Sequence, residues 1–260
     1  MTDQEFIKNL PNAEKFYAVF STSSRMPYIE CDEETYSDKT FLFMDEEQAK
    51  AFTEAYKAKK QTLVVATVEK ANAKNFLASL IADGIDMISF QGEEVHDYPI
   101  DQIVTRTLRE GVKAPIENPA LQISLMYYLQ NARIAETPEE KEELSRMEEE
   151  MMANIARAVY LVPFSSSEEV DDNGNQKVAL MQLKNENDEI FIPLFSDLDE
   201  FLKMKPAEGK SQFLPMGFKQ ISNTKLNGIN GFILNPASAN IRLNEKNIAA
   251  VANRFGDQAK

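Results

Sequence analysis

The sequence is short of the side chains on which most catalytic and metal sites depend. Its 260 residues include one cysteine, one histidine and no tryptophan. A single cysteine excludes an internal disulfide, which favours the reducing cytoplasm as the location of the protein. One cysteine and one histidine cannot build a common structural zinc site within one chain. From these side chains we therefore assign no metal site, no cofactor and no catalytic residue.

Long apolar runs and an excess of cations are also missing. No stretch approaches the roughly 20 residues that cross a bilayer, and the first residues, Met1 to Glu5, lack the basic flank and apolar core of a signal peptide. Lysine and arginine together number 28 against 42 aspartates and glutamates, a net charge of -14. This charge repels phosphate groups, so we expect neither nucleic acid nor a membrane as the partner.

The two rarest reactive side chains stand among carboxylates. His96 lies beside Glu94 and Asp97, a composition typical of a solvated loop. Cys31 precedes Asp32, and neighbouring negative charge raises a thiol pKa, which argues against a nucleophile. No Gly-x-Ser-x-Gly turn and no dinucleotide-binding glycine motif is present. The many carboxylates leave a carboxylate-dependent hydrolase open by residue type.

Apolar periodicity predicts strands and helices that alternate along both halves of the chain. The first half is expected to contain strands 40–44, 63–68 and 86–90, with helices beginning at Asp45 and Asn72. The second is expected to contain strands 190–195, 213–216 and 231–235, with a helix beginning at Ser196 and a second helix over 219–227. Gly228 is expected to end that second helix, because glycine accepts a positive φ. We therefore predict an α+β fold of two related modules, each a mixed sheet with helices packed on it. The expected domains are 1–110 and 118–255, and Thr107–Glu117 is expected to link them.

The two halves also share a short sequence pattern. Residues 84–91 and 228–235 both place Gly-Ile and then Asp or Asn before an apolar strand that ends in an amide. We interpret this as an internal duplication, with the first half as the divergent copy. The alternative is that strand–helix–glycine–strand is simply a common way to pack helices on a sheet.

The second half carries a family resemblance. A predicted helical pair over 118–157 leads into Ala158–Pro163, and the segments Ile192–Asp197 and Asn230–Pro236 contain strand–Pro–x–Phe–Ser and Gly–apolar–Asn–Pro patterns. These features resemble the N-terminal domain of the SseB-like family, the enhanced serine sensitivity proteins, most clearly over about 118–250. Leu234 departs from the isoleucine or valine more usual there. The resemblance implies an α+β fold and a bacterial, cytoplasmic protein, without a catalytic residue or cofactor to carry over.

We therefore predict a non-catalytic binding or regulatory protein that acts through a protein or small-ligand partner. The alternatives are an acidic inhibitor or immunity-like protein that masks a basic partner, and the hydrolase. Parallel strands 190–195 and 231–235 would bring Ser196, Asp197, Asn235 and Pro236 to one sheet edge, where they would border a shallow interaction surface. The alternative for Asn235 is an Asx-type turn that satisfies local backbone groups. If Asn235 contacts a partner, replacing it by alanine should weaken binding with little change in melting temperature.

Overall fold

The structure, a computed structural model, describes residues 3–92, 94–106, 114–170, 176–206 and 211–259. It has an α+β fold, as predicted, and two compact units. The first unit comprises Met1–Ala114 with Gln122–Glu148, and the second comprises Pro115–Leu121 with Glu149–Lys260. Residues 122–148 thus group with the first unit, whereas the sequence assigned them to the second. Most of the predicted link over 107–117 lies outside the described residues, so that link stays a prediction.

The first unit contains one six-stranded mixed sheet. Its strands are β1 (Lys15–Ser21), β2 (Ile29–Cys31), β3 (Asp38–Phe43), β4 (Leu63–Glu69), β5 (Met87–Gln91) and β6 (Val95–Pro99). The order is β4-β1-β3-β5-β6, with β2 also paired to β3. β3 and β5 run parallel and the other pairs run antiparallel. The helices are α1 (Asp3–Asn9), α2 (Glu46–Tyr56) and α3 (Lys70–Ala82).

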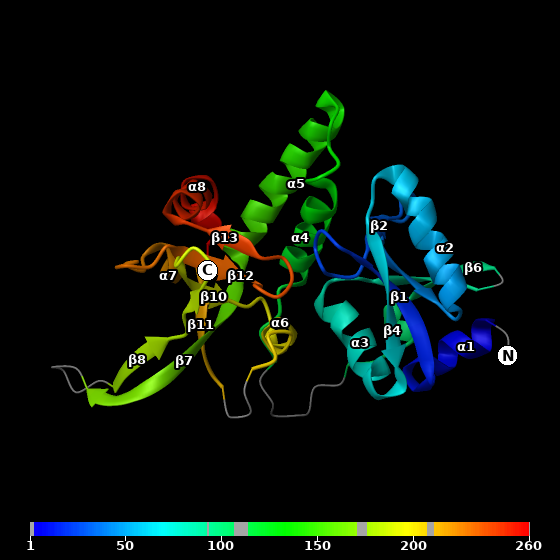
Figure 1. Ribbon diagram of the computed structural model, residues 1–260, viewed down its shortest axis with the longest axis horizontal. Coiled ribbons are helices and arrows are strands. Elements are labelled where there is room, and N and C mark those ends of the chain that lie inside the picture. The colour runs from blue at the N-terminus through cyan, green and yellow to red at the C-terminus, as the bar shows by residue number, and fades with distance from the viewer. Residues whose placement is uncertain (1–2, 93, 107–113, 171–175, 207–210, 260) are drawn as a thin grey trace. The chain divides into compact units, whose positions relative to one another are not determined.

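Helices cover both faces of this sheet (Figure 1). Alternate residues of β1 enter different cores because successive side chains of a strand point to opposite faces. Phe16 and Ala18 pack in the cluster that contains Leu77 of α3. Tyr17 and Val19 belong to a second cluster that contains α2 residues. The near-continuous apolar character of β1 follows from this burial on both sides.

The second unit has a four-stranded and a three-stranded sheet. Its strands are β7 (Val159–Val170), β8 (Gln176–Leu180), β9 (Leu183–Lys184), β10 (Ile190–Leu194), β11 (Gln212–Gly217), β12 (Gly231–Leu234) and β13 (Ile241–Leu243). The orders are β13-β12-β10-β9 and β11-β7-β8. Its helices are α6 (Leu198–Leu202), α7 (Phe218–Ser222) and α8 (Glu245–Phe255). The helices α4 (Pro119–Asn131) and α5 (Pro138–Arg157) each contribute residues to both units.

The strand order of the two units is the same once the two sheets of the second are joined. An isolated bridge pairs Leu161 of β7 with Phe195, through reciprocal backbone hydrogen bonds of 2.8 and 3.0 Å. The order β11-β7-β10-β12-β13, with β9 beside β10, then repeats β4-β1-β3-β5-β6 with β2 beside β3. β10 and β12 run parallel, like β3 and β5. Descent of the two units from one duplicated ancestor stays a hypothesis, which this shared order supports.

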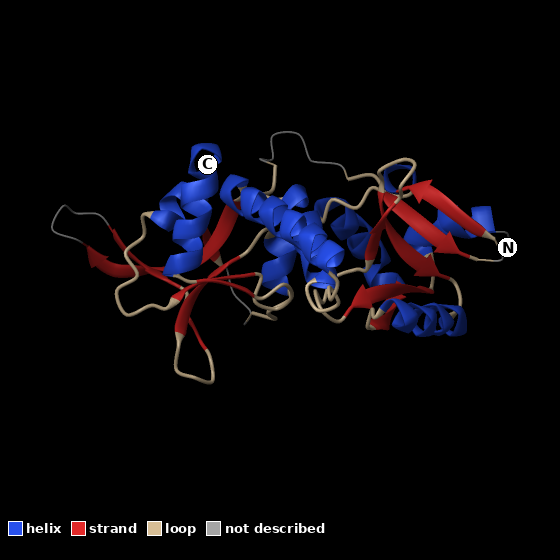
Figure 2. Ribbon diagram, turned by 90° about the horizontal axis from the view of Figure 1, so that it is seen from above, coloured by secondary structure: helices blue, strands red, loops and turns tan. Residues whose placement is uncertain are grey.

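Three local predictions were wrong. His96 lies in the edge strand β6 and not in a loop, because backbone pairing with β5 outweighs the polar composition of this segment. The helix expected over 219–227 ends at Ser222, so Gly228 lies beyond it, although its φ of 71° is positive as expected. The residue that caps α6 is Asp197 and not Ser196. Figure 2 shows that the molecule contains both helices and strands, as an α+β fold requires.

Candidate functional site

The predicted site residues meet where β10 and β12 end. The two strands pair in parallel, with Leu194 opposite Leu234, so the residues that follow them lie at the same sheet edge. The Asn235 backbone N–H continues the ladder by donating to Leu194 O at 2.9 Å. The parallel arrangement expected from the sequence is therefore confirmed, and it brings Ser196 next to Asn235.

A polar cluster fills this strand edge; we call Ser196, Asp197, Glu200, Asn235 and Ser238 the strand-end cluster. All five are at most 4% exposed. Asn235 Oδ1 accepts a hydrogen bond from the Ser196 backbone N–H at 3.0 Å, and Asn235 Nδ2 donates to Ser196 Oγ at 2.9 Å. Asn235 thus connects two segments of the chain, because Ser196 lies 39 positions away from it in the sequence. Its φ of 46° is left-handed, a conformation that asparagine tolerates better than most residues.

Two carboxylates extend the cluster into α6. Asp197 accepts from Ser196 Oγ at 2.7 Å and from the Glu200 backbone N–H at 2.8 Å, which makes it the helix N-cap. The Glu200 carboxylate accepts from Ser238 Oγ and pairs with Lys203. Burial raises the pKa of Asp197 above its usual range, with the hydrogen bonds from Glu200 and Ser196 opposing that rise.

A side chain that the sequence assigned to a helix cap joins the cluster to β7. Asn118 Nδ2 donates to Ser196 O at 2.6 Å and to Val159 O at 2.8 Å, and Asn118 Oδ1 accepts from the Val159 backbone N–H at 3.1 Å. The amide therefore spans the start of β7 and the end of β10. Its position directly before Pro119 also fits a cap, so the sequence held no signal for this second role.

We call the helix that follows the cluster inverted, because its cap and one of its two acidic residues are buried while both of its leucines are exposed; Asp199 is exposed as well. Asp197 and Glu200 are at most 4% exposed, whereas Leu198 and Leu202 are 47% and 52% exposed. The helical spacing of Leu198, Phe201 and Leu202 is typical of a core-facing helix, yet both leucines lie at the surface. Only Phe201 enters the core, where its ring meets those of Phe195 and Phe213 edge-on at 5.3 and 4.8 Å between centroids.

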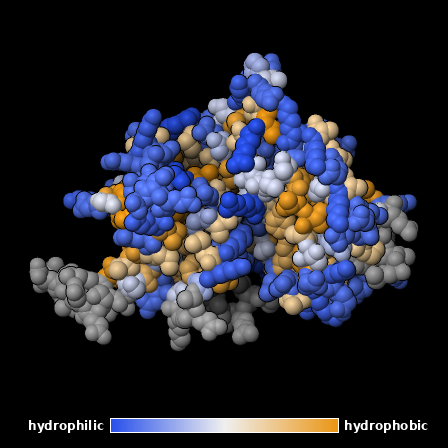
Figure 3. Space-filling model, viewed as in Figure 1, coloured by the Kyte–Doolittle hydropathy of each residue, from blue (hydrophilic) through white to orange (hydrophobic). Residues whose placement is uncertain are grey.

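The cluster can fix the position of α6, but it offers no reactive group to solvent. Its hydroxyls, amide and carboxylates have partners inside the protein, and burial removes them from water. Pro236 is half-buried beside it. Hydrophilic side chains cover most of the molecular face in Figure 3, with apolar patches between them. The outward side of α6 lies close to the cluster, because Asp197 caps this helix and Glu200 lies within it.

Among the residues that the structure describes, the other reactive side chains can be compared with the predictions made for them. Cys31 is exposed, and burial of its sulfur followed by the nearby Asp38 and Asp32 charges raises the pKa of the thiol, in the predicted direction. Over the described ranges, no group of three or more His, Cys, Asp or Glu is placed to hold a metal ion. Within the same part of the chain, no helix is both long and apolar enough to span a membrane.

These features define an α+β protein with a buried polar cluster at the end of two parallel strands. Residues 138–250 match the family model of the SseB protein N-terminal domain, which confirms the resemblance of this region to that family. No curated protein matches the chain.

Two solved structures match weakly. Tic22 from Plasmodium falciparum is 13% identical, with 98% of this chain and 99% of that chain covered and a TM-score of 0.23. The second, titled Anabaena Tic22 (protein transport), is 12% identical over 83% of each chain, also with a TM-score of 0.23. At these scores the likeness carries no argument about function.

Proposed function

We propose that the protein is a non-catalytic binding protein, and that its contact surface is the outward side of α6. The single observation that carries this proposal is the inversion of that helix. Burying Asp197 and Glu200 requires internal hydrogen bonds, and exposing Leu198 and Leu202 forgoes the free energy that leucine gains on leaving water. A protein partner with an apolar surface would cover Leu198 and Leu202, so that binding would supply the free energy of removing these leucines from water.

The strand-end cluster has a positioning role in this proposal. The start of α6 is held in place by Asp197, which caps the helix, and by Asn235, which bonds to the preceding Ser196. Phe201 anchors the helix by packing against two aromatic rings. The two exposed leucines are four residues apart and so share one side of the helix. Ser196, Asp197 and Asn235, which the sequence suggested as the interaction surface, are buried. In this proposal they position the two leucines, and the leucines make the contact.

The polar residues give the hydrolase alternative no support, because the carboxylates of Asp197 and Glu200 lie away from solvent and are bonded within the protein. The acidic inhibitor rests on the net charge of -14. An inhibitor of that kind would bind through charge and lose affinity with added salt. Binding through Leu198 and Leu202 should depend little on salt.

The test compares two exposed apolar surfaces of the second unit. Proteins captured from cell extract by the wild type are identified, and the affinity of each purified candidate is then measured. The double substitution Leu198→Gln with Leu202→Gln should weaken the genuine partner about tenfold or more, from the loss of buried apolar area.

Leu214→Gln on β11 is the matched control, because Leu214 is 40% exposed in the same unit and lies away from α6 in sequence. It should leave the affinity unchanged. Equal affinities for the wild type and the double variant, with both folded, would remove the α6 surface from the proposal.

A further inference from the structure

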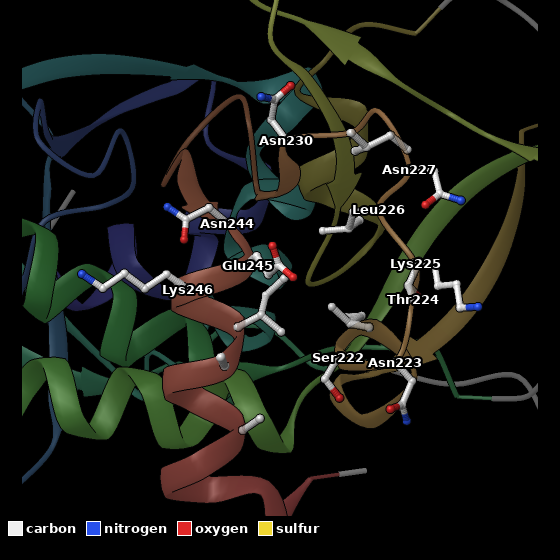
Figure 4. Close-up of a pocket in the computed structure, with 15 residues that line it drawn as sticks. Ser222, Asn223, Thr224, Lys225, Leu226, Asn227, Asn230, Asn244, Glu245 and Lys246 are labelled. Atoms are coloured by element: carbon white, nitrogen blue, oxygen red, sulfur yellow. The ribbon is translucent and has the colours of Figure 1, made fainter.

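Each unit has a surface hollow, and neither hollow contains residues of the strand-end cluster. The hollow of the second unit, about 1010 Å³ in volume, lies between α8 and the segment from Ile221 to Asn230 (Figure 4). The hollow of the first unit, about 440 Å³, lies around the segment Gly84–Met87 and the residues Pro99–Asp101 at the end of β6. The strand order common to both units allows the two hollows to be compared position by position.

The first shared position precedes the second strand of each parallel pair. Asp86 stands directly before β5, and its backbone N–H donates to Asp38 O, at the start of β3, over 3.1 Å. Asn230 stands directly before β12 and makes the same bond to Ile190 O, at the start of β10, over 2.7 Å. Asp86 and Asn230 both line their hollows.

The second shared position follows the next strand. β6 ends at Pro99 and β13 ends at Leu243, and two residues beyond these ends stand Asp101 and Glu245. Both of these acidic residues line their hollows. The hollow of the first unit therefore has the carboxylates of Asp101 and Asp86. The hollow of the second unit has the carboxylate of Glu245 and the amide of Asn230.

Apolar side chains form the base of both hollows. In the second unit Ile221 and Ile248 are buried, and Leu226 and Ile229 are half-buried beside them. In the first unit the corresponding lining includes Ile81, Ile85, Met87 and Ile100. Three pairs of lining residues stand at equivalent positions in the two differing sequences: Ile85 with Ile229, Asp86 with Asn230, and Asp101 with Glu245. The inference rests on this recurrence of a carboxylate beside apolar residues.

Figure 4 shows how the side chains of the larger hollow are directed. Leu226 and Glu245 lie on the sides that face the hollow, from its two opposite walls, whereas the Lys225 and Lys246 side chains extend away from it. Glu245 has no ion pair within the described part of the chain. The accessible charge inside the rim is therefore negative, in agreement with the net charge of -14.

We propose that both hollows bind an aliphatic chain that ends in a cation. Lysine and arginine side chains of a basic peptide and the alkyl-ammonium groups of polyamines share this chemistry. The methylene groups would cover the apolar base, and the cationic end would pair with Glu245 or Asp101 at the rim. The negative charge of the whole protein would draw such a ligand toward it. This site is independent of the contact surface on α6.

The chain has no tryptophan, so a tryptophan in a probe peptide can be followed without interference. The probes are acetylated, amidated peptides of sequence Trp-Leu-X-Leu-X-Leu, in which X is lysine, glutamine or glutamate. Fluorescence anisotropy with the full chain should show that the lysine peptide binds about tenfold or more tightly than the glutamine peptide, and the glutamate peptide least. Equal binding of the three peptides would overturn the proposal.

Charge-removing variants locate the binding. Glu245→Gln should weaken the lysine peptide about fivefold, the upper range for one exposed ion pair, and adding Asp101→Asn should weaken it further. Glu150→Gln, an exposed carboxylate on α5, removes the same charge and should change nothing. Equal effects of Glu245→Gln and Glu150→Gln would mean that only the net charge matters, and would overturn the site.

Two further comparisons identify the source of the ligand and separate this site from α6. Displacement of the lysine peptide by spermidine would support a polyamine ligand, whereas bound peptide that resists spermidine would support a basic protein segment. The variants Leu198→Gln and Leu202→Gln should leave the affinity for the lysine peptide unchanged. A loss of peptide affinity in those variants would place the peptide on α6 and contradict the proposal.

Discussion

The first helix after the parallel strand β3 and the one after its counterpart β10 are built in opposite ways. In the first unit, α2 has 11 residues and begins at the exposed cap Asp45. In the second, α6 has 5 residues and begins at the buried cap Asp197. The same strand order thus supports a helix whose N-cap is exposed to solvent and also one whose N-cap is buried at the end of the strands. α2 contains no leucine, whereas both leucines of α6 face outward.

The largest expected difference between the two helices concerns their aromatic anchors. Phe201 is 3% exposed and packs on two rings, whereas Phe52 of α2 is half-buried against Phe41 and Phe43. Replacing Phe201 by alanine should lower the free energy of unfolding by about 3–5 kcal/mol. Replacing Phe52 by alanine should lower it less, because folding buries less of the Phe52 side chain. Chemical denaturation of both variants measures this, and an equal or larger loss for Phe52 would contradict the comparison.

The next largest effect concerns Asn235. Its burial changes the expectation drawn from the sequence, because alanine would leave the Ser196 backbone N–H without its partner. We expect Asn235→Ala to destabilise the second unit by about 1–3 kcal/mol, the cost of an unpaired buried donor. Thermal unfolding measures the loss, with the exposed Asn253→Ala on α8 as the control. An unchanged melting temperature would show that the cluster is not needed for the fold.

A similar loss is expected at the glycines that precede the second strand of each parallel pair. Gly84 has a φ of 87° and Gly228 a φ of 71°, and both belong to the repeated Gly-Ile segment. Valine at either position should destabilise its unit by about 1–3 kcal/mol, because a β-branched residue is strained in the left-handed region. Gly256, with a φ of -56°, is the control. A comparable loss for Gly256→Val would show that something other than φ is responsible.

The smallest effect concerns pH. Because burial raises the folded pKa of Asp197 above the unfolded value of about 3.9, the folded state holds that proton more tightly. Its contribution to stability should therefore fall as pH rises from about 4 through the raised pKa. The variant Asp197→Asn keeps a capping side chain but lacks this titration. Melting temperatures of both proteins between pH 4 and 7 should diverge in the variant's favour as pH rises, and parallel curves would contradict this.

The sequence predicted the elements that local chemistry determines. β-Branched content identified the strand at 63–68, and the Asp45 cap was confirmed, because each depends on residues close by in the sequence. β6 was missed because its polar composition carries no alternation, and its order comes from pairing with β5. The parallel strands near the site were anticipated, but not the inversion of α6.

That inversion was out of reach because it depends on contacts distant in sequence. The spacing of Leu198, Phe201 and Leu202 is typical of a core-facing helix, and nothing local marks two of the three as exposed. The bonds from Asn235 to Ser196 and from Ser238 to Glu200 join residues 39 and 38 positions apart. They determine which side of α6 faces inward, and a single sequence does not show these pairings.

The central claim is that a partner covers the outward side of α6, and photo-crosslinking in cells tests it most directly. A photoreactive phenylalanine analogue replaces Leu202 in one variant and Val178, 54% exposed on β8, in another. Irradiation should join the variant at 202 to a single partner protein, in a one-to-one product. The variant at 178 should give no such product. The same pattern of products from both positions, or none from 202 with both variants folded, would contradict the account.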